Sequence, residues 1–430
     1  MFSFKKFLTL GSKNKGEIFF LTGTFFLASA LPISYFFYLI SFSISFFKRR
    51  FNFKDKYNIT LLAISVLMVL KIIKLTIIER GYLGEINLQI WLDLCNWLPY
   101  FGVFYYSQEY LQTSKQRLLF SKALISGSIP VIISCLLQAW FKIYGPFETL
   151  FGLIVWFQKP ILVLNAGTTT SGISGLFSNP NYTGIWLVGL VPFIISSIKT
   201  ALNKSFIINL IFIFSIYCIF LTSSKNALIG LFIILILFFG IKSRQFLISS
   251  GILLSLLSFI NFIKSNFADF YSNYDNIFRL NIFDKILSFN IFTSSRFEIY
   301  KIATQLIFEK PIFGWGKSQF SNSYLLNGGN WKIDHTHSMI LEIAFNYGIP
   351  IVLCLIGFVI IIFYSSWIKI NLYKLNKNSY ILDKCWISSG LVIIIGQIPD
   401  ITYYDGKIAT LIWILLAGTR CIGYGKLIKS

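Results

Sequence analysis

The sequence is poor in the side chains that most often carry chemistry in proteins. It has 2 histidines, 3 methionines and 6 cysteines, and only 13% of its 430 residues are charged. No two cysteines have the CxxC spacing, so neither a zinc ribbon nor a disulfide framework is indicated. The cysteines lie mostly within apolar runs, where we expect them to be small core residues.

Acidic residues are also scarce. The chain has 17 Asp and Glu against 38 Lys and Arg, which gives a formal net charge of +21. On a soluble protein this charge would indicate nucleic-acid binding. Here the basic residues lie in short loops between apolar runs, and no segment has a zinc-finger, helix-turn-helix or RNA-binding pattern. The charge therefore follows the positive-inside rule of membrane proteins, and no nucleic-acid partner is expected.

Apolar residues dominate what remains. They make up 55% of the chain, and the mean hydropathy is +0.70. A protein with lipid around its outer face can accommodate that much apolar surface. Most of the apolar runs approach the ~20 residues that a helix needs to cross a bilayer. We predict an all-α, polytopic transmembrane helical bundle of about 12 spans, formed as one membrane domain over residues 1–430.

The first apolar run, 18–47, is too long for one untilted helix and has Pro32 in its middle. It is also about twice as long as the apolar core of a cleaved signal peptide. Loop 48–57, KRRFNFKDKY, and the N-terminal lysines are both strongly basic. Both fall on the cytoplasmic side only if the run is a hairpin of two short helices. The chain is thus expected to be a multi-pass protein of the cell inner (plasma) membrane with both termini cytoplasmic.

Two segments, 140–181 and 264–336, are expected to form external loops. In the first, the run 147–157 is too short to span and is predicted to be re-entrant or interfacial. The second, a large periplasmic loop, is predicted to be partly helical. Its stretch SSRFEIYKIATQLIFEK has helical periodicity, and Pro311 and Gly314 end it. The apolar stripe expected on this helix consists of Phe297, Tyr300, Ala303, Leu306 and Ile307.

Ionisable side chains near membrane spans carry information because they are costly there. Lys74 and Asp93 lie at matched depth on neighbouring predicted spans, so they form either a structural ion pair or, for Lys74, a contact to an anionic substrate. Lys225 lies at the external end of a span, where lysines often snorkel. Asp400 lies in the last external turn, QIPDITYYDGK, where a loop carboxylate is usually solvated.

Both histidines fall in one short motif, HTHSMILEIAFNYGIP, where His337 is predicted to start a helix. His335 and His337 would face apart on a helix and could meet only in an extended chain. Metal binding would need more ligands than the sequence offers, so no metal is expected. Neutral imidazole suits a general base that deprotonates a sugar hydroxyl, and the guanidinium of Arg296 suits a phosphate. The alternative is that His337 only caps or packs.

Four segments resemble the O-antigen ligase and polymerase superfamily of bacterial membrane glycosyltransferases. They are GISGLFSNPNYTGIWL, LTSSKNALIGLF, SSRFEIYKIATQLIFEKPIFGWGKSQF and HTHSMILEIAFNYGIP. The resemblance covers about 171 to 424, and the tail DITYYDGKIATLIWILLAG looks most like cyanobacterial members. It implies glycan transfer from undecaprenyl diphosphate to an acceptor hydroxyl outside the membrane, without metal or cofactor. The partners it implies are a lipid-linked oligosaccharide donor, a lipid A-core or glycan acceptor, and membrane lipids.

The resemblance also implies roles for particular residues. His337 matches the catalytic histidine and Arg296 the loop arginine that binds diphosphate. Lys225 stands where a second family arginine is usual, Asp400 matches an acidic residue near the last external turn, and Asn181 lies in the family's external loop. The predicted site is therefore His337 and Arg296 as catalytic residues, with Lys225, His335, Asp400, Asn181 and Lys74 as substrate-binding residues. An alternative reading of the same cations is a polytopic membrane transporter of a small anion.

Overall fold

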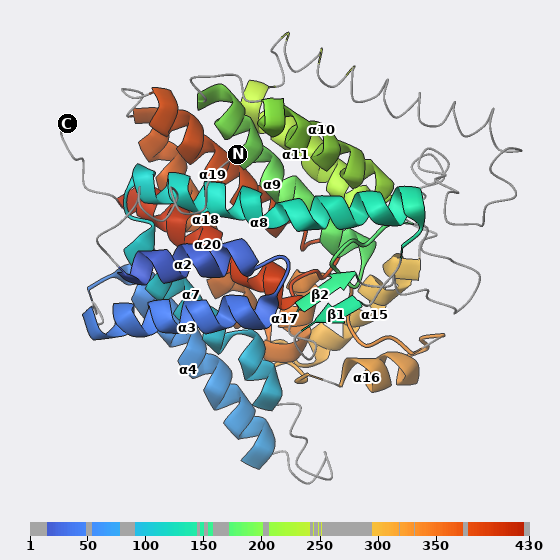
Figure 1. Ribbon diagram of the computed structural model, residues 1–430. Helices are drawn as coiled ribbons and strands as arrows, with labels where there is room; N and C mark the ends of the chain where they lie inside the picture. The colour runs from blue at the N-terminus through green and yellow to red at the C-terminus, as the bar shows by residue number, and fades with distance from the viewer. Residues whose placement is uncertain are drawn as a thin grey trace, which may run out of the picture.

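The computed structural model is built almost entirely of helices, packed as a bundle (Figure 1). It describes residues 15–48, 54–77, 91–143, 147–149, 154–157, 172–200, 206–240, 295–317, 319–330, 332–372 and 377–424, with the isolated residues 244, 248 and 251. The predicted span 245–263 and most of the loop that follows it lie outside these residues. The predicted all-α class is confirmed, with one short two-stranded ribbon added.

The elements follow one another in three groups. The first is α2 (Lys15–Phe26), α3 (Leu31–Lys48), α4 (Lys56–Ile77), η1 (Asp93–Asn96), α7 (Leu98–Ser107), η2 (Gln108–Tyr110) and α8 (Ser114–Phe141). The second is β1 (Phe147–Thr149), β2 (Ile154–Phe157), α9 (Pro180–Thr200), α10 (Phe206–Leu221) and α11 (Lys225–Phe239). The third is α15 (Ser295–Glu309), α16 (Phe320–Leu326), α17 (Met339–Tyr347), α18 (Ile349–Leu372), α19 (Lys377–Ile395) and α20 (Gly406–Tyr424).

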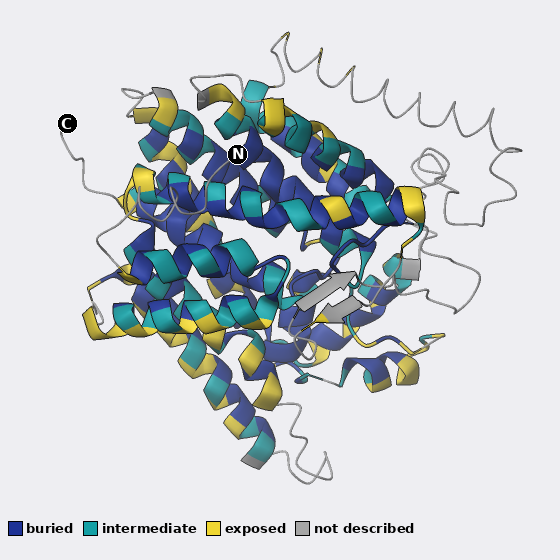
Figure 2. Ribbon diagram, viewed as in Figure 1, coloured by how far each residue is buried: buried dark blue, intermediate teal, exposed yellow. Residues whose placement is uncertain are grey.

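Six of the described helices are long and apolar enough to cross a membrane. These are Leu31–Lys48, Lys56–Thr76, Ser114–Phe141, Pro180–Lys199, Ile349–Leu372 and Gly406–Tyr424. Exposed residues, yellow in Figure 2, line α3 and α4 at the edge of the bundle, where large apolar side chains such as Leu39 and Leu70 face outward. Such exposed apolar faces suit contact with lipid.

The first apolar run is a helical hairpin, as the charge argument predicted. α2 ends at Phe26, and α3 begins at Leu31 with Pro32 in its first turn, where the missing N–H costs nothing. The hydroxyl of Ser34 donates to the carbonyl oxygen of Gly23 at 2.7 Å and so ties the two helices together. The run 147–157 contains an antiparallel ribbon in which Glu148 pairs with Val155.

Helix α15 has the predicted bounds, and its buried face contains three of the five predicted residues. Phe297, expected on the apolar stripe, is 41% exposed. The buried residues are Ile299, Ile302, Ala303, Leu306 and Ile307. The stripe is rotated because α15 packs on α17 and α16, so Ile299 and Ile302 point inward in place of Phe297. Figure 1 shows α15, α16 and α17 together in the lower right of the view.

The corner between α17 and α18 packs backbone against backbone on the segment that leaves α15. The amide of Ile349 donates to the carbonyl of Pro311 at 2.8 Å, and that of Trp315 donates to Phe345 at 2.6 Å. Gly348 has φ 91°, a conformation that glycine adopts readily, and a Cβ there would collide with the carbonyl of Ile312. This corner fixes where α17 ends and α18 begins.

Replacing Gly348 by alanine should therefore lower the melting temperature of the detergent-solubilised protein. Backbone strain alone costs roughly 1–3 kcal/mol, and the collision with Ile312 adds to it. The matched control is Gly357→Ala in α18, where an added Cβ meets nothing within 4 Å. Equal melting temperatures for the two variants would contradict the expectation.

Candidate active site

The two histidines lie in a turn that precedes α17, and neither belongs to the helix. His337 has φ 55°, an uncommon conformation for a residue with a side chain. The hydroxyl of Thr336 donates to the carbonyl of Ser338 at 2.9 Å and closes the turn. The two imidazole rings meet edge to face, with centroids 4.4 Å apart. The prediction that His337 starts the helix is wrong by two residues, and the left-handed turn replaces the extended chain that seemed necessary for the rings to meet.

The turn between α19 and α20, residues 396–405, lies directly against this histidine turn. The amide of Met339, the first residue of α17, donates to the carbonyl of Gln397 at 3.0 Å. The side chain of Gln397 holds its own turn, since it accepts from the amide of Thr402 at 3.0 Å and donates to the Thr402 hydroxyl at 2.7 Å. Asp400 is thereby held next to the histidines, although more than 60 residues separate them in the chain.

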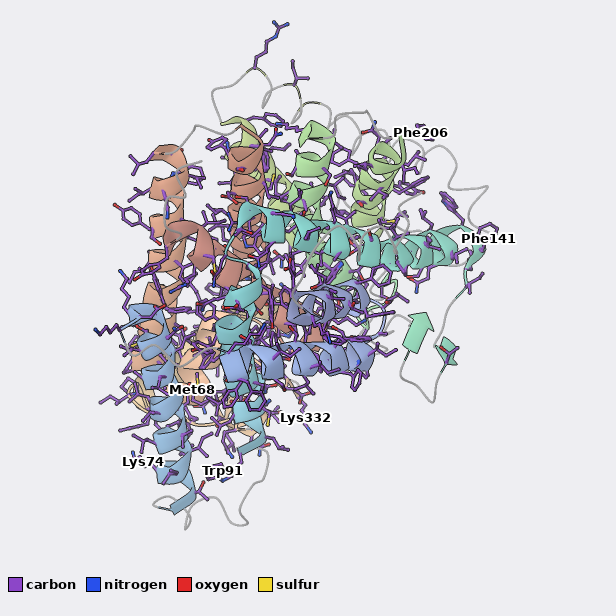
Figure 3. The ribbon with its side chains drawn as sticks, turned by 60° about the vertical axis from the view of Figure 1, so that its left-hand side comes forward. Met68, Lys74, Trp91, Phe141, Phe206 and Lys332 are labelled. Atoms are coloured by element: carbon purple, nitrogen blue, oxygen red, sulfur yellow. The ribbon has the colours of Figure 1, made fainter. Side chains whose placement is uncertain are left out.

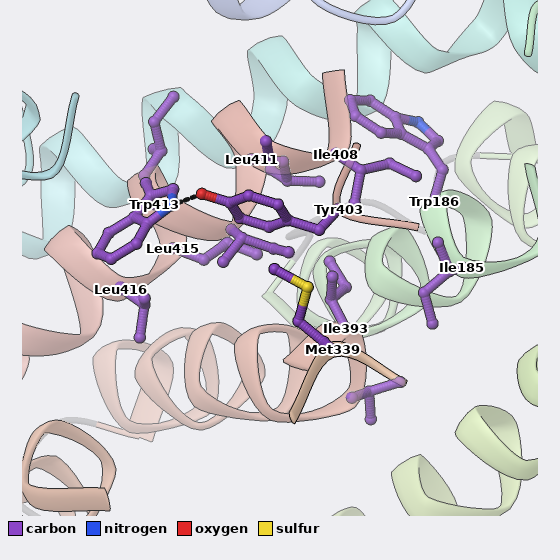
Figure 4. Close-up of a cluster of buried hydrophobic side chains, with 14 of the residues drawn as sticks. Ile185, Trp186, Met339, Ile393, Tyr403, Ile408, Leu411, Trp413, Leu415 and Leu416 are labelled. Carbon is purple, nitrogen blue, oxygen red and sulfur yellow. Dashed lines mark hydrogen bonds between the residues drawn. The ribbon is translucent and has the colours of Figure 1, made fainter. Parts of the chain in front are cut away.

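The histidine turn and the turn that carries Asp400 both pack on one buried apolar cluster. Met339 and Tyr403 lie in it together with residues of α9, α19 and α20 (Figure 4). The indole N–H of Trp413 donates to the hydroxyl of Tyr403 at 2.8 Å. Because both turns pack against the same close-packed cluster, their movement relative to one another is limited.

Three of the predicted site residues lie around the side chain of Asp400. Its Oδ1 lies 3.8 Å from Nδ1 of His337, and its Oδ2 lies 3.9 Å from Nη2 of Arg296. The amide Nδ2 of Asn181 donates to the same Oδ2 at 2.7 Å. The Asp400 side chain is only 10% exposed. Because a buried carboxylate needs such partners, Asp400 is not the solvated loop carboxylate that its position in the sequence favoured.

Arg296 reaches the site from the first turn of α15. Its Nη1 donates to the carbonyl of Pro399 at 2.6 Å, while its side chain is 42% exposed. The hydroxyl of Tyr300, one turn further along the helix, donates to the carbonyls of Pro399 and His337, each at 3.3 Å. α15 is therefore hydrogen-bonded to both the histidine turn and the turn that carries Asp400. The Arg296 side chain also stays partly exposed, where an anion can reach it.

The charges at the site follow from burial and proximity. Burial, and then repulsion from His337, lowers the pKa of His335 below 6.5, so this ring is neutral at neutral pH. Burial alone would raise the pKa of Asp400, but the neighbouring His337 and Arg296 outweigh it and hold that pKa below 3.8. A carboxylate anion thus lies next to an imidazole whose Nδ1 has no hydrogen-bond partner among the described residues.

Lys225 lies near the same turn, and Lys74 does not. Lys225 is the first residue of α11, and its neighbour Asn226 donates from Nδ2 to the carbonyl of Gly396 at 2.7 Å. This contact places the start of α11 against the turn that carries Asp400. Lys74 lies toward one end of α4 (Figure 3), with its Nζ 3.9 Å from the ring centre of Phe313. It belongs to a second cluster, on the segment that leaves α15.

Asp93 belongs to this second cluster. Its carboxylate forms an ion pair with Lys317 at 3.2 Å and accepts a hydrogen bond from Asn96 at 2.9 Å. Asp93 is thus paired with Lys317, on the segment that follows α15, whereas the sequence analysis considered only Lys74 as its partner. The sequence carries no local signal for this pairing, because 224 positions separate the two residues.

Glu342, considered from the sequence only as a metal ligand, has a different environment. It is 4% exposed and accepts hydrogen bonds from the amide of Thr336 at 2.9 Å, the hydroxyl of Tyr404 at 3.0 Å and Nδ2 of Asn346 at 3.2 Å. Burial raises the pKa of Glu342, and the donated hydrogen bonds oppose that rise. Its sequence signal is a lone carboxylate in an otherwise apolar helix.

The site thus combines an imidazole next to a carboxylate with a partly exposed guanidinium, where the histidine turn, the turn that carries Asp400 and the start of α15 meet. An imidazole paired in this way can take a proton and stabilise the resulting cation, and a guanidinium can bind phosphate oxygens. Among the described residues, no group of three or more His, Cys, Asp or Glu is placed to hold a metal ion.

Comparison with known proteins finds one family. Residues 210–356 match the family model described as O-antigen ligase. The matched segment runs from α10 to the start of α18, so it contains Lys225, Arg296, His335 and His337. Asn181 and Asp400 lie outside the matched segment. No curated protein matches the chain.

Proposed function

Because the chain belongs to the O-antigen ligase and polymerase superfamily, we propose that it transfers a glycan from an undecaprenyl-diphosphate donor to an acceptor hydroxyl. The observation that carries the proposal is the convergence of His337 and Arg296 on the buried carboxylate of Asp400. In this proposal, the general base and the phosphate-binding cation have the same carboxylate as their neighbour. The match to the family carries no information on the cyanobacterial branch.

In the proposed reaction, His337 is the general base. Nδ1 faces Asp400, so Nε2 is the atom that accepts the proton of the acceptor hydroxyl. The hydroxyl oxygen forms its new bond to the anomeric carbon of the donor. The bond from that carbon to the phosphate oxygen breaks on the opposite face, and its electron pair leaves with the lipid diphosphate. Asp400 stabilises the imidazolium that results.

Arg296 and Lys225 bind the diphosphate in this scheme. The leaving group gains negative charge as the bond breaks, and fixed cations beside it lower the barrier without needing a metal ion. Lys225 supplies a point charge and lacks the bidentate fork of the family arginine, so its grip on phosphate is less directional. Asn181 orients Asp400, and His335 contacts the acceptor next to His337. Lys74, in the second cluster, binds the substrate away from the reacting atoms.

The chain is a multi-pass membrane protein, and we propose the inner membrane as its location, with both termini cytoplasmic. The acceptor is a lipid A-core sugar for a ligase or a growing glycan for a polymerase. The test is transfer of a labelled glycan from its undecaprenyl diphosphate to acceptor lipid in proteoliposomes. Product formed by the wild-type protein supports the proposal. Uptake of labelled anion without any transfer would favour the transporter.

Replacing Asp400 by asparagine should lower kcat roughly 10-fold or more, since a carboxylate that backs a catalytic imidazole stabilises its protonated form. Asp400 is ionised at neutral pH because its pKa is held below 3.8. Without this anion the imidazolium that forms during the reaction loses a stabilising charge, so kcat should fall while the donor KM changes little.

The matched control for this variant is Asp405→Asn. Asp405 lies in the same turn and accepts from the amides of Lys407 and Ile408 at 2.9 and 3.3 Å, which an asparagine oxygen can also do. We expect its kcat to match that of the wild type. A wild-type kcat for Asp400→Asn would remove Asp400 from the mechanism.

A further inference from the structure

The conformation of the histidine turn needs an explanation of its own. His337 has φ 55°, which costs free energy for any residue with a Cβ and persists only when the surroundings impose it. Its neighbours on both sides are tied down. The amide of Thr336 donates to Glu342 at 2.9 Å, and the Thr336 hydroxyl donates to the carbonyl of Ser338 at 2.9 Å. The carboxylate of Glu342 is therefore one of the groups that impose the turn.

The same carboxylate reaches the other half of the site. Its Oε1 accepts from the hydroxyl of Tyr404 at 3.0 Å, and Tyr404 lies in the turn that carries Asp400. On the other side of Asp400, the carbonyl of Gln397 accepts from the amide of Met339 at 3.0 Å. Two hydrogen bonds therefore join the first turn of α17 to the turn that carries Asp400, one on each side of Asp400 in the chain. The first joins Met339 to Gln397, and the second joins Glu342 to Tyr404.

We infer that Glu342 is the positioning residue of the site, which fixes the base His337 and its partner Asp400 relative to each other. This inference rests on the proposed function for its consequence in catalysis, though not for its geometry. Glu342 touches neither the reacting atoms nor a substrate in this arrangement, since Oε1 and Oε2 face Tyr404, Asn346 and Thr336. It acts through the two turns that it joins.

A carboxylate suits this task better than an amide. The hydrogen bonds described for Glu342 all come from donors, and a carboxylate accepts at both oxygens. In Glu342→Gln, one oxygen becomes an NH₂ group. Facing the amide of Thr336 it loses that tie, and facing Tyr404 and Asn346 it must reverse the direction of both hydrogen bonds, so the spacing of the two turns changes in either case. A displacement of about 1 Å in a catalytic group can cost ~100-fold in rate. We expect kcat to fall about 10- to 100-fold while the donor KM stays within about 2-fold.

The chain offers a readout of position that does not depend on activity. With 2 histidines, a protein labelled with nitrogen-15 in its histidine rings gives signals from His335 and His337 alone. His335→Gln assigns them. In Glu342→Gln, the ring signals of His337 should shift, because the turn and the distance to Asp400 change. Tyr404→Phe is the milder second variant, since it removes one donor and keeps the ring. It should shift the same signals in a folded protein.

Asp55→Asn is the matched control. Asp55 is also a buried carboxylate, 4% exposed, and it is paired with Arg420 near the end of α20. Arg420 lies about 20 Å along α20 from the Asp400 turn at 1.5 Å per residue. This variant should lower the melting temperature and leave the histidine signals and kcat per folded molecule unchanged.

The outcomes separate the two proposals. Shifted His337 signals together with a lower kcat in Glu342→Gln support the positioning role. A wild-type His337 spectrum or a wild-type kcat in this variant overturns it. A loss of kcat in Glu342→Gln that Asp55→Asn shows to the same extent also overturns the positioning role. A wild-type protein that transfers no glycan would overturn the proposed function, and the histidine spectra would then decide the positioning role by themselves.

Discussion

Replacing His337 by alanine should lower the rate of glycan transfer by about 10²- to 10⁴-fold, the usual contribution of a positioned general base. The acceptor hydroxyl then has no group to take its proton, while the diphosphate still meets Arg296. Hence kcat should fall much more than the donor KM changes. The measurement is transfer in proteoliposomes at matched amounts of inserted protein. In cells, long surface polysaccharide should be lost.

His335→Gln is the matched control for this loss. The two rings are in contact, and both lie in the same turn, so a general disturbance of the turn should appear in both variants. Nδ1 of His337 is the atom that faces Asp400, which is why we propose this ring as the base. His335 contacts the acceptor in the proposed scheme and takes no proton, so its variant should raise the acceptor KM and leave kcat close to that of the wild type. Wild-type transfer by His337→Ala, or an equal loss in both variants, would contradict the assignment.

The second large effect is expected at Arg296. Replacing it by alanine removes the cation beside the leaving group, and losing one such stabilising group costs about 10²- to 10³-fold in rate. It also removes the hydrogen bond to the carbonyl of Pro399. Because the donor diphosphate is the ligand, its KM should rise together with the fall in kcat. Arg296→Lys should recover part of the rate, since it keeps the charge and loses the bidentate fork.

Lys301→Ala provides the control on the same helix. Lys301 is exposed on α15 and five positions beyond Arg296, so it shares the helix and the sign of charge. Its loss should leave both kinetic constants near wild type. Equal changes of kcat and donor KM in Arg296→Ala and Lys301→Ala would mean that Arg296 acts only through the overall positive charge of this surface. They would contradict its role as a ligand of the diphosphate.

Much of the fold could be predicted because its signals are local. The run around Pro32 splits into two helices since a proline is tolerated in a first turn, and the basic loop 48–57 favoured this hairpin. The bounds of α15 follow from its period and from the breakers Pro311 and Gly314. Its buried face was missed at Phe297, because which side turns inward depends on how α15 meets α17.

The candidate site could be predicted only in part, for the same reason. His337, Arg296, Asn181 and Asp400 could each be named from short motifs, and the structure brings them together. Lys74 was grouped with them from the sequence and lies instead in the cluster around Phe313. Motifs give the kinds of side chain that a site needs, but not which of the candidate cations lies close to His337.

The sequence by itself determined the class of the molecule and the identity of its only histidines. Composition, the length of the apolar runs and the order of the motifs do not depend on how the helices pack. Only the tertiary structure decided that Asp400 is buried between His337 and Arg296, that Asp93 pairs with Lys317, and that Glu342 joins the histidine turn to the turn that carries Asp400. These contacts link residues that lie far apart in the chain. They form only when helix packing sets a distance and an orientation that no local pattern encodes.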